Sequence, residues 1–191
     1  MSVFLIRHGE TSWNKAYIMQ GRVDIELNEV GKSQANEARA EMENIPIDIC
    51  FVSPLKRARQ TAEIVLSGRE VPLLVEPRLI EMAYGEYEGM SRSEECYLRQ
   101  RRKLAHRYPK GESYLDVAQR VYNLLDEIKA NHRDENVLLV CHGGVGRLIR
   151  SYFIDDLEND DFFDTIIPNG KPIRFEFSDR EIPLIENPVA D

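Results

Sequence analysis

Short apolar runs alternate with longer amphipathic stretches along the whole chain. The apolar runs predict β-strands at residues 2–6, 47–52, 73–75, 136–141 and 173–177. The first, second and fourth runs are apolar enough to lie at the centre of a sheet whose two faces are both covered. This order of elements is typical of a mainly parallel sheet with helices on both faces, so the sequence predicts an α/β fold.

Helix signals lie between these runs. Good helix formers and apolar positions at helical spacing predict helices at 31–43, 53–66 and 113–130, and a fourth that begins near Gly144. Ser53 is expected as the N-cap of the second of these helices, with Pro54 at its first helical position. The highly charged segment 90–107 is expected to form a further helix outside the sheet core.

Composition and charge limit the classes of function. A chain of 191 residues with 42% hydrophobic and 30% charged residues has the makeup of one globular domain, expected to cover residues 1–191. Its net charge of -8 would be repelled by nucleic acid and by anionic membranes, so neither is expected as a partner. The early apolar run at 3–6 is too short for a signal peptide or a membrane helix, and a cytoplasmic location is expected. The three widely spaced cysteines are expected to be reduced thiols, without a zinc site or a disulfide framework.

Two of the expected strands lead directly into a histidine. Arg7-His8-Gly9 follows the first strand, and His142-Gly143-Gly144 follows the fourth. Ligands bind at this edge of open α/β sheets, glycine lets them approach the backbone, and a helix opening here offers free N–H groups to an anion. A single histidine at a strand end is more typical of a structural hydrogen bond. Two of them with arginine nearby favour an anion-binding pocket.

Three basic residues, Lys56, Arg57 and Arg59, lie at the start of the helix expected after the second strand. Cations in the first turn of a helix oppose its dipole, so an anionic or acidic group is expected to compensate them. A solvated basic face is the ordinary alternative for any one of them. The planar guanidinium suits phosphate oxygens better than a lysine ammonium does, which favours arginine as the phosphate ligand.

The motifs, taken together and in order, resemble the histidine phosphatase superfamily, which includes the cofactor-dependent phosphoglycerate mutases. The resemblance runs from Val3 to about Arg147, and the ordered set is much more specific than any single motif. Its parts are Leu5-Ile6-Arg7-His8-Gly9-Glu10-Thr11, Trp13-Asn14, Gln20-Gly21, Ser53-Pro54-Leu55-Lys56-Arg57-Ala58-Arg59-Gln60-Thr61-Ala62, Glu81 with Gly85 and Glu88-Gly89, Gly111-Glu112-Ser113, and Val140-Cys141-His142-Gly143-Gly144.

The resemblance implies a three-layer α/β/α sandwich with a mainly parallel central sheet, and a phosphomonoesterase that uses neither metal nor cofactor. It implies that His8 attacks the phosphorus of a small phosphorylated metabolite and that Glu81 protonates the leaving oxygen. The attacking nitrogen of His8 must then be unprotonated, so its other ring nitrogen is expected to donate to a backbone carbonyl or a carboxylate. Arg7, Arg57 and His142 are implied as further catalytic residues, and the implied phosphate ligands are Arg7, Asn14, Gly21, Arg57, His142 and Gly143.

Two other enzyme classes remain as alternatives. A phosphoglycerate mutase, an isomerase, would use the same phosphohistidine, but such mutases carry Glu-Arg-His-Tyr-Gly where this chain has Glu81-Met82-Ala83-Tyr84-Gly85, and they are generally longer. A metallophosphatase with His8, His142 and carboxylates as ligands is less favoured, because arginines lie beside or near both histidines in the motifs. The carboxylates that compete with Glu81 for the role of the acid are Glu76, Glu86 and Glu88.

The basic run from Arg99 to Arg107 is expected to be a solvated helix face. In the alternative hypothesis, the segment at about 90–110 covers the pocket, and one of these arginines binds a second anionic group of the substrate. The motifs specify neither the physiological substrate nor the oligomeric state, and they leave the path of the chain after Ser178 open.

Overall fold

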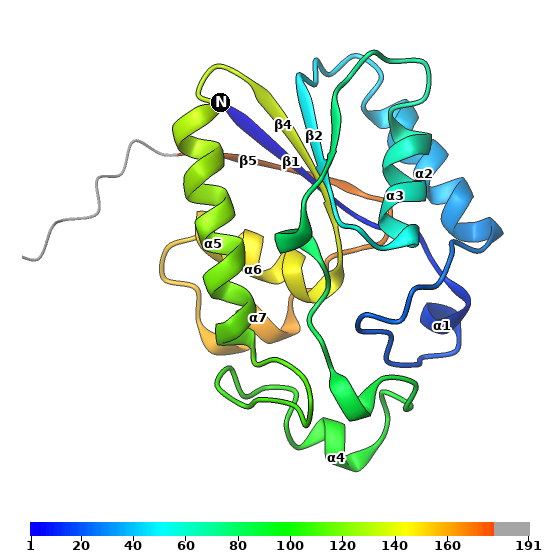
Figure 1. The fold of residues 1–191 in the computed structure, drawn as a ribbon, viewed down its shortest axis with the longest axis vertical. Coiled ribbons are helices and arrows are strands. Elements are labelled where there is room, and N and C mark those ends of the chain that lie inside the picture. Colours follow the sequence, from blue (N-terminus) through cyan, green and yellow to red (C-terminus); the bar gives the residue numbers. More distant parts are fainter. Residues whose placement is uncertain (178–191) are drawn as a thin grey trace, which may run out of the picture.

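Five strands form one sheet in the order β3-β2-β4-β1-β5 (Figure 1). The computed structural model describes residues 1–177 of the chain, and the path after Ser178 lies outside them. Neighbouring strands are parallel except at β5, which runs antiparallel to β1. The bounds are β1 Ser2–Arg7, β2 Ile49–Val52, β3 Leu73–Val75, β4 Asn136–Cys141 and β5 Pro172–Glu176. Each of the five predicted strands is therefore present.

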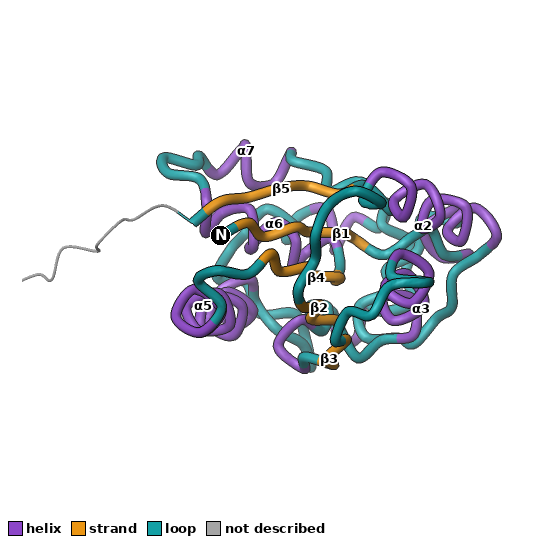
Figure 2. The backbone as a smooth tube through the Cα atoms, turned by 90° about the horizontal axis from the view of Figure 1, so that it is seen from above, coloured by secondary structure: helices purple, strands orange, loops and turns teal. Residues whose placement is uncertain are grey.

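Four long helices cover the two faces of this sheet (Figure 2). One face carries α2 (Glu29–Glu41) and α3 (Lys56–Val65), and the other carries α5 (Tyr114–Asn131) and α6 (Gly143–Phe153). This arrangement in three layers confirms the predicted α/β class. Among residues 1–177, no helix combines the length and the apolar character that crossing a bilayer requires.

The side chains of β1 alternate between two apolar cores. Val3 and Leu5 belong to the core under α5 and α6, whereas Phe4 and Ile6 belong to the core under α2 and α3. None of these four side chains is more than 5% exposed. Because packing holds β1 on both faces, the residues that follow its carboxyl end are placed rigidly.

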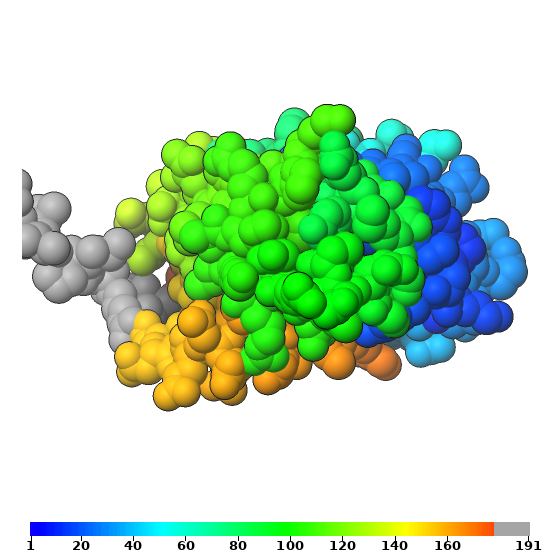
Figure 3. Space-filling model, turned by 90° about the horizontal axis from the view of Figure 1, so that it is seen from below, coloured from blue at the N-terminus to red at the C-terminus, as the bar shows by residue number. Residues whose placement is uncertain are grey.

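The segment after residue 90 is not the single helix that its charge pattern predicted. Only α4 (Glu95–Leu98) is helical, and turns make up most of the remainder. Tyr97 and Tyr108 make ring contacts with each other and with Tyr84, so the segment folds back on its aromatic side chains. In Figure 3 the green part of the chain, which includes this segment, fills the centre of the face seen from below. The segment after residue 90 covers the carboxyl ends of the parallel strands.

The remaining helical elements are short and lie in the connections. They are α1 (Ser12–Lys15), α7 (Asn159–Asp164) and two 3₁₀ turns, Pro77–Leu79 and Gly85–Tyr87.

The start of α3 also differs from the expectation. The helix begins at Lys56, and its N-cap is Leu55, which gives no side-chain hydrogen bond. Ser53 is not the cap, because its hydroxyl lies 2.6 Å from Nε2 of His142. The serine of this motif is thus directed toward the end of β4 and away from the helix.

Candidate active site

The register of β1 and β4 brings the two predicted histidines together. Arg7 pairs with Cys141 in this parallel ladder, so the next residue of each strand is a histidine. The ring centroids of His8 and His142 are 5.2 Å apart. Both side chains are buried, with 3% and 0% of their surface exposed. The sheet edge therefore holds two imidazoles in contact and nearly shielded from water.

His8 is fixed by bonds at both ring nitrogens. Nδ1 lies 2.7 Å from the carbonyl oxygen of Gly9, and Nε2 accepts a hydrogen bond of 3.2 Å from Nε of Arg57. Since a carbonyl only accepts and the guanidinium only donates, the hydrogen of the neutral ring is on Nδ1 and the lone pair is on Nε2. Burial, together with the charges of Arg57 and Arg7, holds the pKa of His8 well below its usual value. This is the state of His8 that the sequence predicted.

Arg57 is held by the loop that precedes α2. Besides the bond to His8, its two terminal nitrogens donate to the carbonyl oxygens of Gly21 and Val23, at 2.7 and 2.8 Å. The side chain is only 1% exposed, and this burial lowers its pKa to about 10. Asp24 and Glu26 meet the first turn of α3 through Lys56, so the acidic groups expected there are present. The guanidinium is thus positioned before any ligand arrives.

Arg7 is the last residue of β1 and also lines the cavity. One of its terminal nitrogens donates to the carbonyl oxygen of Ile167 at 2.8 Å, and burial lowers its pKa to about 10. Its Nε is buried and has no hydrogen-bond partner within residues 1–177. A buried donor of this kind is costly unless a ligand accepts from it.

Glu81 lies at the amino terminus of α6. Its carboxyl oxygens accept backbone N–H bonds from Met82 at 2.9 Å, Gly144 at 3.2 Å and Val145 at 3.3 Å. A Cβ at position 144 would lie 2.8 Å from Oε1 of Glu81, so a larger residue there would displace this carboxyl group. The helix terminus therefore aims this carboxyl group toward the same sheet edge as the histidines.

The three competing carboxylates are engaged elsewhere. Glu76 pairs with Arg78, Glu86 pairs with Lys110, and Glu88 accepts from the amides of Arg22 and Tyr84. None of the three lines the cavity beside His8, whereas Glu81 does.

That cavity is small, with a volume of about 90 Å³. The predicted residues that line it are Arg7, His8, Asn14, Gly21, Arg57, Glu81 and Gly143. His142 is not among the lining residues, and its buried Nδ1 has no hydrogen-bond partner in the described part of the chain. The structure thus brings all eight predicted residues to one place, with His142 beneath the surface of the cavity.

The three weaker predictions differ in what they offer a ligand. Asn14 uses its Oδ1 to accept from Thr11, which leaves its side-chain NH₂ group for a ligand. Gly21 presents its carbonyl oxygen to Arg57, so it acts on this arginine and offers no donor with that atom. Gly143 is the first residue of α6, where backbone N–H groups lack partners inside the helix.

Sequence reasoning missed other residues that line the cavity. Arg92 and Tyr97 come from the covering segment, and Arg147 comes from α6. The signal for Arg147 was its place four residues after Gly143, one helical turn along the same face. None of the arginines from Arg99 to Arg107 lines the cavity, whereas Arg92 of the covering segment does.

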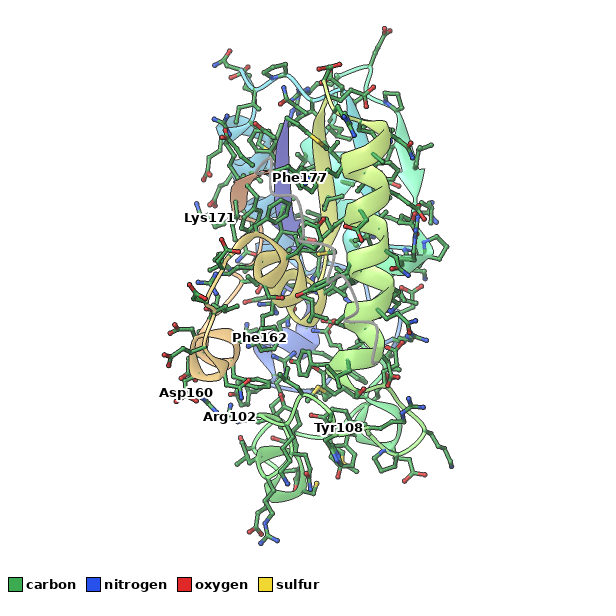
Figure 4. The ribbon with its side chains drawn as sticks, turned by 90° about the vertical axis from the view of Figure 1, so that its left-hand side faces the viewer. Arg102, Tyr108, Asp160, Phe162, Lys171 and Phe177 are labelled. Atoms are coloured by element: carbon green, nitrogen blue, oxygen red, sulfur yellow. The ribbon has the colours of Figure 1, made fainter. Side chains whose placement is uncertain are left out.

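The basic run contributes to the surface instead. Arg99 pairs with Glu95, and Arg107 pairs with Asp116. Arg102 binds Asp160 and Asp164 of α7, and Figure 4 shows Arg102 and Asp160 side by side. These three arginines do not line the cavity.

The side chains of the site differ from those of a metal centre. Within residues 1–177 no three side chains of His, Cys, Asp or Glu are grouped as metal ligands. The groups nearest to His8 are instead His142 and the cations Arg7 and Arg57.

Comparisons with known proteins agree on one family. Residues 3–186 match the family model of the histidine phosphatase superfamily, branch 1. The "Probable phosphatase C1687.21" of Schizosaccharomyces pombe is 36% identical over 190 residues, which are 98% of this chain and 88% of the relative. The 2,3-bisphosphoglycerate-dependent phosphoglycerate mutase of Cytophaga hutchinsonii is 32% identical over 187 residues, 92% of this chain and 87% of the relative. The crystal structure of the α-ribazole phosphatase of Shigella flexneri superposes with a TM-score of 0.83 at 27% identity, covering 94% of this chain and 92% of that one.

Proposed function

Because the chain belongs to the histidine phosphatase superfamily, we propose that it is a phosphomonoesterase that hydrolyses a small phosphorylated metabolite through a phosphohistidine on His8. The observation that carries this proposal is the state of His8. Its Nδ1 donates to the Gly9 carbonyl, so the lone pair on Nε2 faces the arginines of the cavity. An imidazole held this way is a ready nucleophile for phosphorus.

In the first step, Nε2 of His8 forms a bond to phosphorus while the bond from phosphorus to the alcohol oxygen breaks. Arg57 occupies Nε2 in the free protein, so the phosphoryl oxygens must take over its Nε–H before the attack. Arg7 and Arg57 then face the charge that spreads over the transferring group, which is the main requirement of phosphoryl transfer. Glu81 carries the proton that passes to the leaving oxygen.

In the second step, the carboxylate of Glu81 takes a proton from water, and the water oxygen bonds to phosphorus. The bond between phosphorus and Nε2 breaks, which returns neutral His8 and releases inorganic phosphate. Both roles require Glu81 to stay close to the phosphoryl group, and the amides of Gly144 and Val145 hold it there. No step assigned to these residues uses a metal ion, so we propose a metal-independent enzyme.

The first experiment is hydrolysis of p-nitrophenyl phosphate in EDTA by the wild type and by His8→Ala, with a search for phosphoprotein after quenching. We expect activity that survives EDTA, disappears in the variant, and leaves phosphate on the wild type that is labile to acid and stable to base. Activity that EDTA abolishes, or that His8→Ala retains, contradicts the proposal. As a control for folding, the variant should keep the wild-type circular dichroism spectrum.

The similarity to a phosphoglycerate mutase supports a second candidate, transfer of the phosphoryl group to another hydroxyl. The two candidates share the phosphohistidine and differ in the acceptor. Incubation with 3-phosphoglycerate separates them, because a phosphatase releases inorganic phosphate whereas a mutase forms 2-phosphoglycerate. We expect phosphate release to dominate.

The charges of the cavity favour a substrate with a second anionic group. Four arginines line it, Arg7, Arg57, Arg92 and Arg147, against the single carboxylate of Glu81. With Glu81 ionised, a phosphate dianion offsets two of the three excess positive charges and one remains. With Glu81 protonated, as the first step requires, two remain. Arg92 is the cation best placed to bind a second anionic group, since its buried Nε has no hydrogen-bond partner among the described residues. We therefore propose a phosphorylated alcohol that also carries a carboxylate or a further phosphate.

Two matched substrates test this choice, namely 3-phosphoglycerate and glycerol 3-phosphate, which differ in one carboxylate. Arg92→Gln should lower kcat/KM for 3-phosphoglycerate about 10- to 100-fold, the value of one charge-assisted hydrogen bond. For glycerol 3-phosphate the loss should be much smaller. Arg99→Gln is the control, because Arg99 pairs with Glu95 outside the cavity. Equal losses on both substrates would contradict the role of Arg92.

A further inference from the structure

Ser53 is buried beside His142 and has no part in the steps above. Its side chain is fully buried, and its Oγ lies 2.6 Å from Nε2 of His142. The position is fixed by the sheet, because the Ser53 amide continues the β2–β4 ladder by donating to Val140. Ser53, which the sequence pattern predicted as a helix N-cap, is therefore held in contact with the imidazole of His142.

The hydrogen bonds around Ser53 determine the direction of this contact. Its Oγ accepts from the amide of Leu55 at 3.4 Å. In the described part of the chain, the acceptor within reach of its hydroxyl hydrogen is Nε2 of His142. The hydroxyl therefore donates to Nε2, and the hydrogen of the neutral imidazole is on Nδ1.

We infer that Ser53 is a positioning residue that fixes His142 with its hydrogen on Nδ1, so that this N–H donates to a phosphoryl oxygen. The inference rests on the proposed function, because the acceptor is the phosphoryl group transferred to His8. Nδ1 of His142 is buried without a partner in residues 1–177, and the ring lies against His8. An unpaired N–H in that place is complementary to an anion.

The opposite tautomer would fail on both sides of the ring. With hydrogen on Nε2, the hydroxyl hydrogen of Ser53 would be buried without an acceptor, and the bare lone pair of Nδ1 would face the phosphoryl oxygens. Burial and the charge of Arg57 also hold the pKa of His142 well below its usual value, so the ring is neutral near pH 7 and has a defined tautomer. His8 and His142 thus share one tautomer and differ in the edge they present. His8 has its lone pair on Nε2, where Arg57 donates, and His142 has its hydrogen on Nδ1, which has no partner in residues 1–177.

The tautomer is measured directly by two-dimensional NMR of protein labelled with ¹⁵N-histidine, in which protonated and bare ring nitrogens have well separated shifts. His8→Asn and His142→Asn assign the two rings. We expect a protonated Nδ1 and a bare Nε2 in both rings of the wild type. A protonated Nε2 in His142 would overturn the inference.

Activity supplies the second readout. Ser53→Ala should lower kcat on p-nitrophenyl phosphate about tenfold or more with a smaller change in KM, since the lost donor acts on charge that develops in the transition state. In the same variant the ¹⁵N shifts of His142 should show a mixture of tautomers. Ser53→Thr, which keeps the hydroxyl, should restore both readouts. Ser151→Ala, which removes a hydroxyl bound to Tyr122 away from the cavity, is the matched control.

Wild-type kcat together with a wild-type spectrum in Ser53→Ala would also overturn the inference. If Ser53→Ala does not fold, the spectrum of the wild type still decides. Failure of the proposed function is recognised separately, since it would appear as a wild type that forms no phosphohistidine.

Discussion

The two buried histidines should make the stability of the protein depend on pH. Burial and neighbouring cations hold the pKa values of His8 and His142 well below 6.5 in the folded state. The unfolded chain binds protons at these positions with a pKa of about 6.5. Below that pH the unfolded state therefore holds more protons than the folded state, and acid favours unfolding. The contribution of the neutral histidines to the free energy of unfolding is therefore fully present above about pH 6.5, and it is lost as the pH falls toward their pKa values in the folded state.

The size of the effect follows from the same linkage. When the folded ring stays neutral, lowering the pH from about 6.5 to about 5 reduces the free energy of unfolding by about 1–2 kcal/mol per histidine. The two rings together give about 3 kcal/mol, a large part of the 5–15 kcal/mol that is typical of a whole domain. Ordinary carboxylates titrate near pH 4 and contribute little in this interval.

Urea unfolding at several pH values, followed by circular dichroism, measures this loss. His8→Asn and His142→Asn should each reduce this loss by about 1–2 kcal/mol, and the double variant should nearly abolish it. The comparison is between two pH values within one protein, so the cost of the substitution itself cancels. Other titrating groups cancel in the difference between wild type and variant.

A wild type and a His8→Asn variant with the same pH dependence would refute the reasoning. Such a result would mean that His8 takes up its proton as readily in the folded protein as in the unfolded chain. Its ring would then be hydrated, and the buried state of the nucleophile would be wrong.

Three further predictions concern other parts of the molecule. Gly144→Ala should lower kcat about 10- to 100-fold without loss of folding, because a Cβ 2.8 Å from Oε1 displaces Glu81. Gly143→Ala should cost much less, because a Cβ there would lie 3.5 Å from the guanidinium of Arg7, an ordinary contact distance. Ellman's reagent should titrate one thiol rapidly in the native protein and three in urea, since only Cys96 of the three cysteines is exposed. Leu139→Ala should reduce the free energy of unfolding by about 2–5 kcal/mol in urea titrations, because this side chain is fully buried in a central strand.

The sheet was predictable because its apolar runs are short, strongly apolar and separated by clear helix signals. Both histidines were predictable for the same reason, since each directly follows one of these runs. The pairing of β1 with β4 then brings them together. Local sequence therefore determined the part of the site that lies on the rigid sheet.

The parts that sequence reasoning missed depend on contacts between distant segments. The segment after residue 90 has the charge pattern of a helix, yet the ring contacts of Tyr97 and Tyr108 fold it into turns. Ser53 has the pattern of an N-cap, yet its hydroxyl binds a histidine 89 residues away. No motif singled out Arg92 within the segment at 90–110, because its place at the cavity results from the path of this covering segment. Propensity and capping rules describe neighbours in sequence and cannot detect such contacts.

The same geometry explains why one family of folds suits this chemistry. A parallel pair of central strands ends with two side chains at one level, and packing on both faces leaves these side chains little freedom. Each imidazole then acquires its proposed role from one further contact, the Gly9 carbonyl for His8 and the Ser53 hydroxyl for His142. If the two contacts were exchanged, each ring would carry its hydrogen on the other nitrogen. His142 would then have the lone pair of the proposed nucleophile, and His8 the hydrogen of the proposed donor. The identity of the two residues as histidines is thus less informative than the atom that each one bonds outside the cavity.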